Sequence, residues 1–336
     1  MSTTRPDIAS DSSIREKAML VATSPSNCYA QRTNCPCCDT PASAAHDRVC
    51  SSPRAENIPL TEHGRVLSGY APGRVFFTYV RCGKCDAYYC PIYYSAERLQ
   101  SLYAEQAENM AGVPLDSRER TQNGYLNILR RHSRMRGGLL EIGADVGLFA
   151  EACARAGQFD RFWLSEPNRA VHGDLARRFA GRNATILSTM LPAAQVPACA
   201  VSTAVMIHVL DHVLEPRGVL RDVFATLEPD GVLMIITHNV RSWLARLLGH
   251  RWPPFTLQHP QLFSPESIRL LLRLCGFEVL EVICTTNYFP AAFLARAGLT
   301  VLGLPAKWLP EHGGPDIGVQ LGNMCAIARR PRDLPL

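Results

Sequence analysis

From residue 138 onward, hydrophobic positions alternate between two patterns that predict buried strands separated by amphipathic helices. Short continuous apolar runs are typical of strands covered on both faces, and apolar positions spaced three and four apart are typical of helices. Strands are expected at 138–143, 161–165, 185–187, 201–206, 231–236 and 278–284, and helices at 148–156, 168–180, 216–227 and 264–275. This order predicts an α/β fold in which helices cover both faces of a mostly parallel sheet.

The pattern differs before residue 137. Residues 96–110 and 118–136 carry leucines and tyrosines at helical spacing, which predicts a helical connector over 96–136. Residues 28–95 are rich in cysteine, proline and tyrosine, and residues 1–27 form a polar stretch expected to be a disordered leader. The expected order is therefore leader 1–27, cysteine module 28–95, connector 96–136 and α/β domain 137–336.

Composition narrows the class of protein. Of 336 residues, 47% are hydrophobic and 19% charged, which excludes a disordered or fibrous chain. A net charge of +5 is too small to indicate a nucleic-acid-binding protein by itself. The first 30 residues lack the apolar core of a signal peptide, and no run of 18 apolar residues exists. A cytoplasmic protein without a membrane-spanning helix is expected.

Eight of the 13 cysteines lie in the first 90 residues, and four of them form two C-x-x-C motifs. The pairs Cys35/Cys38 and Cys82/Cys85 can together supply four thiolates to one zinc ion. A closed four-sulfur site leaves no position for water, so this zinc would be structural and 28–95 would be a zinc-ribbon module. The alternatives are incidental cysteines or a redox pair, and the possible substitute ligands are Cys37, Cys50 and Cys90.

A glycine-containing loop, Glu141-Ile-Gly143-Ala-Asp145-Val-Gly147, lies where the first strand of the α/β region meets its first helix. Glycines at this position let backbone amides approach a ligand closely. Glu166, at the end of the second strand, is placed to accept hydrogen bonds from two ribose hydroxyls. The loop lacks the G-x-G-x-x-G spacing of dinucleotide sites, and the carboxylate of Glu141 would repel a pyrophosphate. These features favour S-adenosylmethionine (SAM), a cationic cofactor without phosphate.

Residues 33–330 resemble the bacterial class I SAM-dependent methyltransferases that carry an N-terminal zinc ribbon. The resemblance rests on the two cysteine motifs and on the segments L-E-I-G-x-x-x-G (140–147), S-E-P-N (165–168), V-L-D-H-V-x-E-P (209–216), L-E-P-D-G-V-L (227–233) and H-P-x-x-F-S-x-x-S-I-x-x-L-L (259–272). It implies a Rossmann-like seven-stranded sheet whose last, reversed strand spans 323–329. It also implies methyl transfer to a small-molecule or sugar-containing acceptor.

The resemblance also assigns residues to the cofactor. Glu141, Gly143, Ala144 and Gly147 would hold the methionine end of SAM, Glu166 the ribose, Met190 and Leu191 the adenine, and Ile207 the region near the methyl group. One departure matters, because Asp145 stands where the family has a further glycine. A side chain pointing into the loop there would weaken cofactor binding. Asn168 is expected to cap the following helix.

Methyl transfer from a sulfonium needs a base only when the acceptor must lose a proton. Three histidines after the fourth and fifth strands are candidates for this role, in the order His208, His212, His238. Asp211 and His212 could also be two ligands of a divalent ion, although the sequence offers no third. Residues 242–263, rich in Trp and Pro, are expected to contribute to a substrate lid.

Two further functions remain open at this point. One is an rRNA or tRNA methyltransferase that uses the zinc ribbon and the basic run 130–136 to bind RNA, although such a run is more often a solvated helix face. The other is a zinc-binding scaffold whose SAM loop has decayed at Asp145. The sequence does not indicate an oligomeric state.

Overall fold

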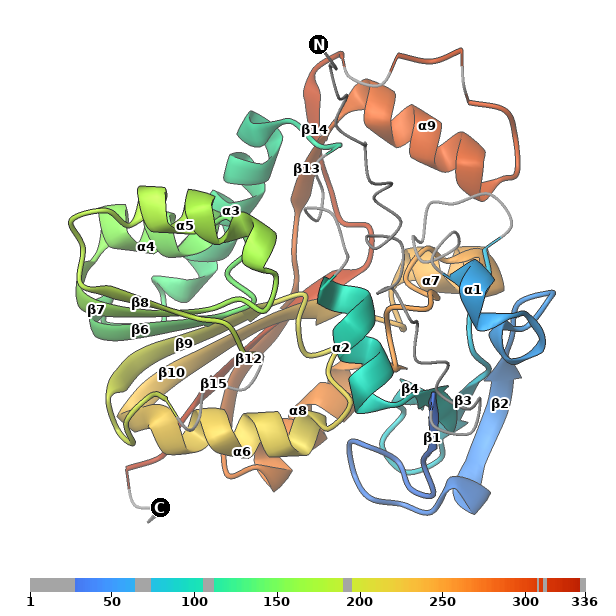
Figure 1. Cartoon of the computed structure of the whole chain (residues 1–336), viewed down its shortest axis with the longest axis horizontal. Coiled ribbons are helices and arrows are strands. Elements are labelled where there is room, and N and C mark those ends of the chain that lie inside the picture. Colours follow the sequence, from blue (N-terminus) through green and yellow to red (C-terminus); the bar gives the residue numbers. More distant parts are fainter. Residues whose placement is uncertain are drawn as a thin grey trace, which may run out of the picture.

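The computed structural model describes residues 28–63, 74–104, 112–189, 195–306, 308–310 and 313–332 (Figure 1). The leader expected at 1–27 lies outside the described residues, as do Met190 and Leu191.

A seven-stranded sheet forms the centre of the α/β region, in the order β12-β15-β10-β9-β6-β7-β8. The central strands pair in parallel, and β15 lies antiparallel between β10 and β12. This confirms the predicted Rossmann-like sheet with a reversed last strand. The strands are β6 (Arg136–Ile142), β7 (Gln158–Ser165), β8 (Ala184–Leu187), β9 (Val201–Ile207), β10 (Leu227–His238), β12 (Glu278–Cys284) and β15 (Asn323–Arg329).

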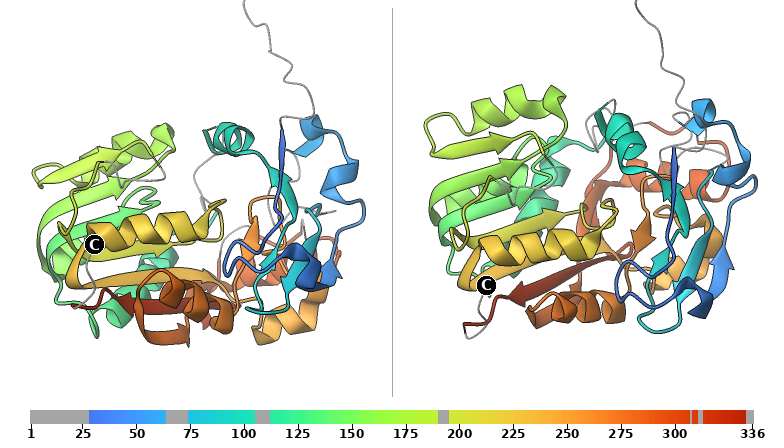
Figure 2. Two further views of the ribbon diagram at one scale, coloured as in Figure 1. Left: turned by 90° about the horizontal axis from the view of Figure 1, so that it is seen from below. Right: turned by 60° about the horizontal axis from the view of Figure 1, so that its bottom comes forward.

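Helices cover both faces of this sheet (Figures 1 and 2). On one face the apolar sides of three helices pack on the strands, and on the other face two helices do so. Burying both faces explains why the central strands are continuous apolar runs. The first set is α3 (Leu115–Leu129), α4 (Leu148–Ala156) and α5 (His172–Arg178), and the second is α6 (Pro216–Thr226) and α8 (Pro265–Leu274).

Local capping fixes several of these boundaries. Ser264 and Ser267 form a reciprocal capping box at the start of α8. Asn168 accepts a hydrogen bond from the backbone N–H of Ala170, which confirms its predicted role as a cap, here of the short 3-10 helix η5 (Arg169–Val171). The helix expected over 118–136 ends earlier, because the chain turns after Leu129 and enters β6 at Arg136.

The cysteine module does not form a separate sheet of its own. Its strands β2 (Ala45–Val49), β3 (Tyr79–Cys82) and β4 (Tyr88–Tyr89) form a sheet in the order β11-β4-β3-β2, and β11 (Gln261–Leu262) comes from the α/β region. Strands β1 (Tyr29–Gln31) and β5 (Ile92–Tyr94) pair separately. The second C-x-x-C motif connects β3 to β4, which pair as an antiparallel hairpin. Short helices in the module are η2 (Ala42–Ala44), η3 (Ala55–Asn57) and α1 (Leu60–His63).

An aromatic core joins this module to residues 242–263. Phe76 and Tyr79 of the module pack against Phe255, whose ring also contacts Trp252. Trp252 and Phe255 are buried, so these two aromatic rings pack inside this core. The same segment contains α7 (Trp243–Leu248) and the 3-10 helix η7 (Gly249–Arg251).

The remaining elements lie at the edges of the fold. Helix α2 (Ala96–Ala104) follows the module, and the hairpin β13 (Asn287–Pro290) and β14 (Asp316–Val319) flanks α9 (Ala291–Val301). Among the described residues, no helix combines the length and apolar character needed to cross a membrane.

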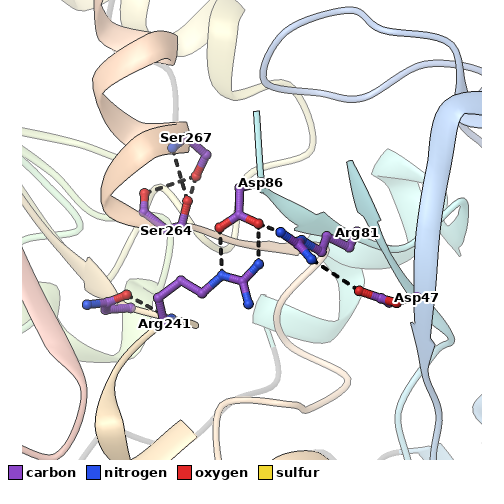
Figure 3. A network of polar contacts seen from close by, with 7 residues as sticks. Asp47, Arg81, Asp86, Arg241, Ser264 and Ser267 are labelled. Carbon is purple, nitrogen blue, oxygen red and sulfur yellow. Dashed lines mark hydrogen bonds and ion pairs between the residues drawn. The ribbon is translucent and has the colours of Figure 1, made fainter. Parts of the chain in front are cut away.

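Asp86, directly after the second C-x-x-C motif, ties the module to the end of β10 (Figure 3). Its carboxylate accepts hydrogen bonds from Arg81 Nε (2.6 Å) and Arg241 Nε (2.7 Å), and it also pairs with Arg241 Nη2. Burial alone would raise the pKa of Asp86, but the two guanidinium groups outweigh it and lower that pKa. The network therefore joins three segments through one charged side chain.

Replacing Asp86 with asparagine is expected to lower the free energy of unfolding by about 2 kcal/mol, because charge-assisted hydrogen bonds are lost and two guanidinium groups are left facing each other. Asp47→Asn is the control, since Asp47 also pairs with Arg81 (3.3 Å) but its side chain is 60% exposed. We expect that control to cost less than about 0.5 kcal/mol in urea denaturation. Equal losses of unfolding free energy in the two variants would refute the role of Asp86 in joining the module to the end of β10.

Candidate functional site

The loop after β6 adopts the backbone conformation that a close approach to a cofactor requires. Gly143 and Gly147 have φ of +74° and +80°, and Asp145 between them has φ of +49°. Aspartate is one of the few non-glycine residues that adopt this left-handed region readily, which explains why Asp145 can replace a glycine. The N–H groups of Gly143 and Ala144 donate to the carbonyl of Ser165, at 2.8 and 3.1 Å. The loop is thus held against the end of β7.

Glu166 organises this loop through its carboxylate. Oε2 accepts from the N–H of Asp145 and Oε1 accepts from the N–H of Asn168, each at 2.8 Å. Each carboxylate oxygen has two lone pairs, so each can still accept one ribose hydroxyl. Glu166 can therefore hold the loop and a ribose at the same time.

Glu141 is buried at the end of β6, beneath the loop. Its Oε2 accepts a hydrogen bond from the N–H of Ala150 in the first turn of α4 (3.0 Å). Burial raises the pKa of Glu141, and the nearby carboxylates of Asp145 and Glu166 raise it further. A cationic group bound in this loop would lower the pKa of Glu141 again. The site therefore suits the ammonium of a methionine moiety.

The other predicted cofactor residues divide into two groups. Ile207 is the last residue of β9 and is half-buried beside Ile236 of β10. Met190 and Leu191, predicted to pack on the adenine, are among the residues not described, so their role stays a prediction.

Four histidines and one aspartate meet at the carboxyl ends of β9 and β10. The His238 ring lies 4.7 Å from that of His208 and 4.9 Å from that of His259, measured between ring centroids. His259 in turn lies 4.5 Å from His212. Asp211 accepts a hydrogen bond from His238 Nδ1 through Oδ2 (2.5 Å). We call these five residues the histidine cluster, and it brings together all three histidines predicted from the sequence.

The hydrogen bonds define which nitrogens carry protons. His259 Nδ1 donates to the Pro254 carbonyl (2.7 Å), so its Nε2 accepts from His212 Nε2 (3.2 Å). His238 Nδ1 donates to Asp211, which leaves the lone pair of His238 on Nε2. His238 Nε2 can therefore accept a hydrogen bond.

Burial keeps most of the cluster's histidines neutral. It lowers the pKa of His208 and His212 to about 3 and that of His259 to about 4, and the neighbouring imidazoles act in the same direction. Burial would raise the pKa of Asp211, but His238 and its neighbours outweigh that effect and lower it. At neutral pH the cluster thus contains the carboxylate of Asp211 together with the neutral imidazoles of His208, His212 and His259.

The cluster lies next to the loop after β6. Strand β9 separates β6 from β10 in the sheet, with Met206 opposite Ile142 and Ile207 opposite Ile236. A Cβ on Gly143 would lie only 2.4 Å from Cγ2 of Val209, the residue after His208. The loop is therefore in direct contact with the segment that carries His208, Asp211 and His212.

The cysteine module supports the cluster from the other side. Tyr79 donates from its hydroxyl to the carbonyl of His259 (2.5 Å). Gln261, in β11 of the module's sheet, donates to the carbonyls of Leu210 and Val213 (3.0 and 2.7 Å) on either side of Asp211 and His212. The positions of the catalytic candidates thus depend on the module.

The four predicted zinc ligands converge. The Sγ atoms of Cys35 and Cys85 are 3.6 Å apart, as are those of Cys38 and Cys82, and all four lie within 4.8 Å of one another. Sulfurs about 2.3 Å from a tetrahedral zinc would be separated by about 3.8 Å. The four thiols therefore fit a zinc ion. Of the predicted substitutes, Cys37 and Cys90 are fully buried and Cys50 is half-buried.

The basic run 130–136 lies at the opposite, amino-terminal end of the strands. Arg131 and His132 both contact Glu281, at 3.1 and 2.8 Å, and Arg134 lies 3.5 Å from Asp230. These three side chains therefore pair with acids of the same chain.

The sequence pattern missed the pairing of Asp211 with His238, which lies 27 residues away, although it offered Asp211 as a possible metal ligand. Asn323, whose Nδ2 lies 3.5 Å from His208 Nε2, gave no signal beyond its place at the start of the last strand. Contacts between strand ends that are distant in sequence depend on the sheet order.

Residues 116–282 match a family model described as a methyltransferase domain. No curated protein sequence matches the chain. Among solved structures, a chain of the complex between the Haloferax volcanii Trm112 methyltransferase activator and a methyltransferase has 12% identity and a TM-score of 0.51, and the match covers 69% of this chain and 97% of that one. Burkholderia thailandensis 1,6-didemethyltoxoflavin-N1-methyltransferase has 15% identity and a TM-score of 0.42, covering 63% and 78%.

The family match spans the glycine loop, Glu166 and all of the histidine cluster, while the reversed strand β15 completes the sheet beyond it. The sheet order and the similarity to the first of these structures agree with that match in fold. The chain therefore contains a class I SAM-dependent methyltransferase domain.

Proposed function

We propose that this protein transfers a methyl group from SAM to a small-molecule or sugar-containing acceptor that binds at the histidine cluster. The observation that carries the proposal is the contact of Gly143, in the loop after β6, with Val209, which directly follows His208 of the cluster. An acceptor placed there would face both the methyl group of the cofactor and several neutral imidazoles.

The loop and Glu166 would hold SAM, with Glu141 near the methionine ammonium. Positioning supplies much of the rate of a methyl transfer, because the sulfonium is already activated. The histidine cluster would remove the acceptor's proton when the acceptor is a hydroxyl or a protonated amine. His208, His212 and His238 are the candidates for contact with the acceptor.

The zinc at Cys35, Cys38, Cys82 and Cys85 would be structural. Four thiolates complete its coordination, so it would act by fixing the module that supports the cluster. Removing the zinc would disturb the acceptor site, because Tyr79 and Gln261 hold the backbone of the cluster in position.

The alternatives from the sequence have less support. An RNA methyltransferase would need a free basic surface near the acceptor, whereas Arg131 and Arg134 pair with acids at the far end of the sheet. A scaffold with a decayed loop would need Asp145 to disrupt that loop, whereas its N–H bonds to Glu166.

The test is methyl transfer by variants of the cluster. His212→Ala and His238→Ala should each lower the rate of methyl transfer by about 100-fold or more, because a positioned base contributes at least that much. The assay follows production of S-adenosylhomocysteine (SAH) with a library of hydroxylated acceptors, and SAH affinity should stay within a factor of two or three.

His250→Ala is the matched control, because His250 is exposed and lies outside the cluster. It should retain wild-type activity. Full activity in both cluster variants would place the acceptor elsewhere and overturn the assignment.

A further inference from the structure

Three residues of the histidine cluster come together from different segments. His208 follows β9, Asp211 lies in the turn before α6, and His238 ends β10. Each offers one metal-ligating atom, and these atoms all lie within 4.8 Å of one another. Two imidazoles and one carboxylate form a donor set that differs from the four thiolates of the cysteine module.

Two buried polar atoms at this point have no hydrogen-bond partner among the described residues: Asp211 Oδ1 and His208 Nδ1. Asp211 is fully buried, and leaving a buried carboxylate oxygen unsatisfied is costly. Buried polar groups nearly always have a hydrogen-bond partner, so a bound group is expected next to both atoms. A cation between them would satisfy both at once.

We propose that His208, Asp211 and His238 bind one divalent transition-metal ion. Two imidazoles and a carboxylate favour zinc or ferrous iron over magnesium or calcium, which prefer oxygen ligands. Ligand atoms about 2.1 Å from such an ion lie at most about 4.2 Å apart, so only small side-chain movements are needed. Three protein ligands leave at least one coordination position open.

Residues around the proposed metal ligands would help to hold them in position. His212 and His259 form their own hydrogen-bonded pair beside Asp211. Groups of this kind commonly orient metal ligands.

The role of this ion in catalysis rests on the proposed function, although its binding does not. An acceptor hydroxyl bound to the open position would become more acidic, as metal-bound water does. Its proton would pass to water, its oxygen would form the bond to the methyl carbon, and the electrons of the broken S–CH₃ bond would return to sulfur as SAH leaves. The acceptor class implied is a molecule with a hydroxyl able to bind a metal.

The experiment uses the full chain, stripped with a chelator and titrated with Co²⁺ alone. Cobalt–thiolate charge-transfer absorption reports the cysteine site, and ligand-field bands without charge transfer report a nitrogen and oxygen site. The wild type should bind two equivalents, one of each kind. Asp211→Asn and His238→Ala should each bind one, with the thiolate signal intact, which also shows that the module is folded.

His250→Ala should keep both equivalents. A wild type that binds a single equivalent, or an Asp211→Asn variant that keeps two, would overturn the proposal. SAH titration of the same samples separates it from the proposed function. SAH binding with one cobalt would refute only the second metal site, and two cobalt ions without SAH binding would refute only the methyltransferase.

Discussion

Replacing Glu166 with alanine is expected to weaken binding of SAM or SAH by about 100-fold or more. Hydrogen bonds to a charged acceptor contribute about 1.5–3 kcal/mol each, and Glu166 is placed to accept two from the ribose. The change would also release the N–H groups of Asp145 and Asn168, which its carboxylate now holds. Isothermal titration calorimetry with SAH measures the loss directly.

Asp160→Ala is the matched control for this variant. Asp160 is an exposed acid on β7, close to the amino-terminal end of the strand that leads to Glu166. It should leave SAH affinity unchanged. If Glu166→Ala bound SAH as tightly as Asp160→Ala, the ribose assignment would be wrong.

Replacing Cys82 with serine should remove the thiolate-bound zinc and unfold much of the cysteine module. Apparent binding free energies of structural zinc are about 10–16 kcal/mol, so losing the zinc costs more free energy than the folding of a small module supplies. Because Tyr79 and Gln261 hold the backbone around the histidine cluster, methyl transfer should be lost while SAH binding persists. Metal analysis and calorimetry on one preparation check both parts.

Cys284→Ser tests whether the effect belongs to the four-cysteine site. Cys284 is exposed at the end of β12, so this variant should keep its zinc, its stability and its activity. A Cys82→Ser protein with unchanged zinc content would show that the four thiols do not form the site.

The sheet was predictable because each of its strands and helices is specified by a short stretch of sequence. Each strand buried on both faces is a continuous apolar run, and helix starts such as Ser264 and Asn168 carry their own capping signals. The loop from Glu141 to Gly147 and the two C-x-x-C motifs are likewise short-range patterns. The boundary between α3 and β6 was less predictable, since the helical composition of 130–136 continues past the last helical turn.

The arrangement around the site depends on contacts between distant segments, which a single sequence does not encode locally. Nothing in Gln261–Leu262 indicates that it completes the sheet of a module 170 residues earlier, where it pairs with Tyr88 and Tyr89. The same holds for Asp211 and His238, which meet only because β9 and β10 are neighbours. Sequence reasoning found these residues but not their pairing.

We expect this chain to bind SAM in the loop after β6. Calorimetric titration of the purified full chain with SAH tests it most directly. We predict one site per chain with a dissociation constant in the micromolar range, sharply weakened in Glu166→Ala. Absence of binding by the folded wild-type protein at millimolar SAH would contradict the claim.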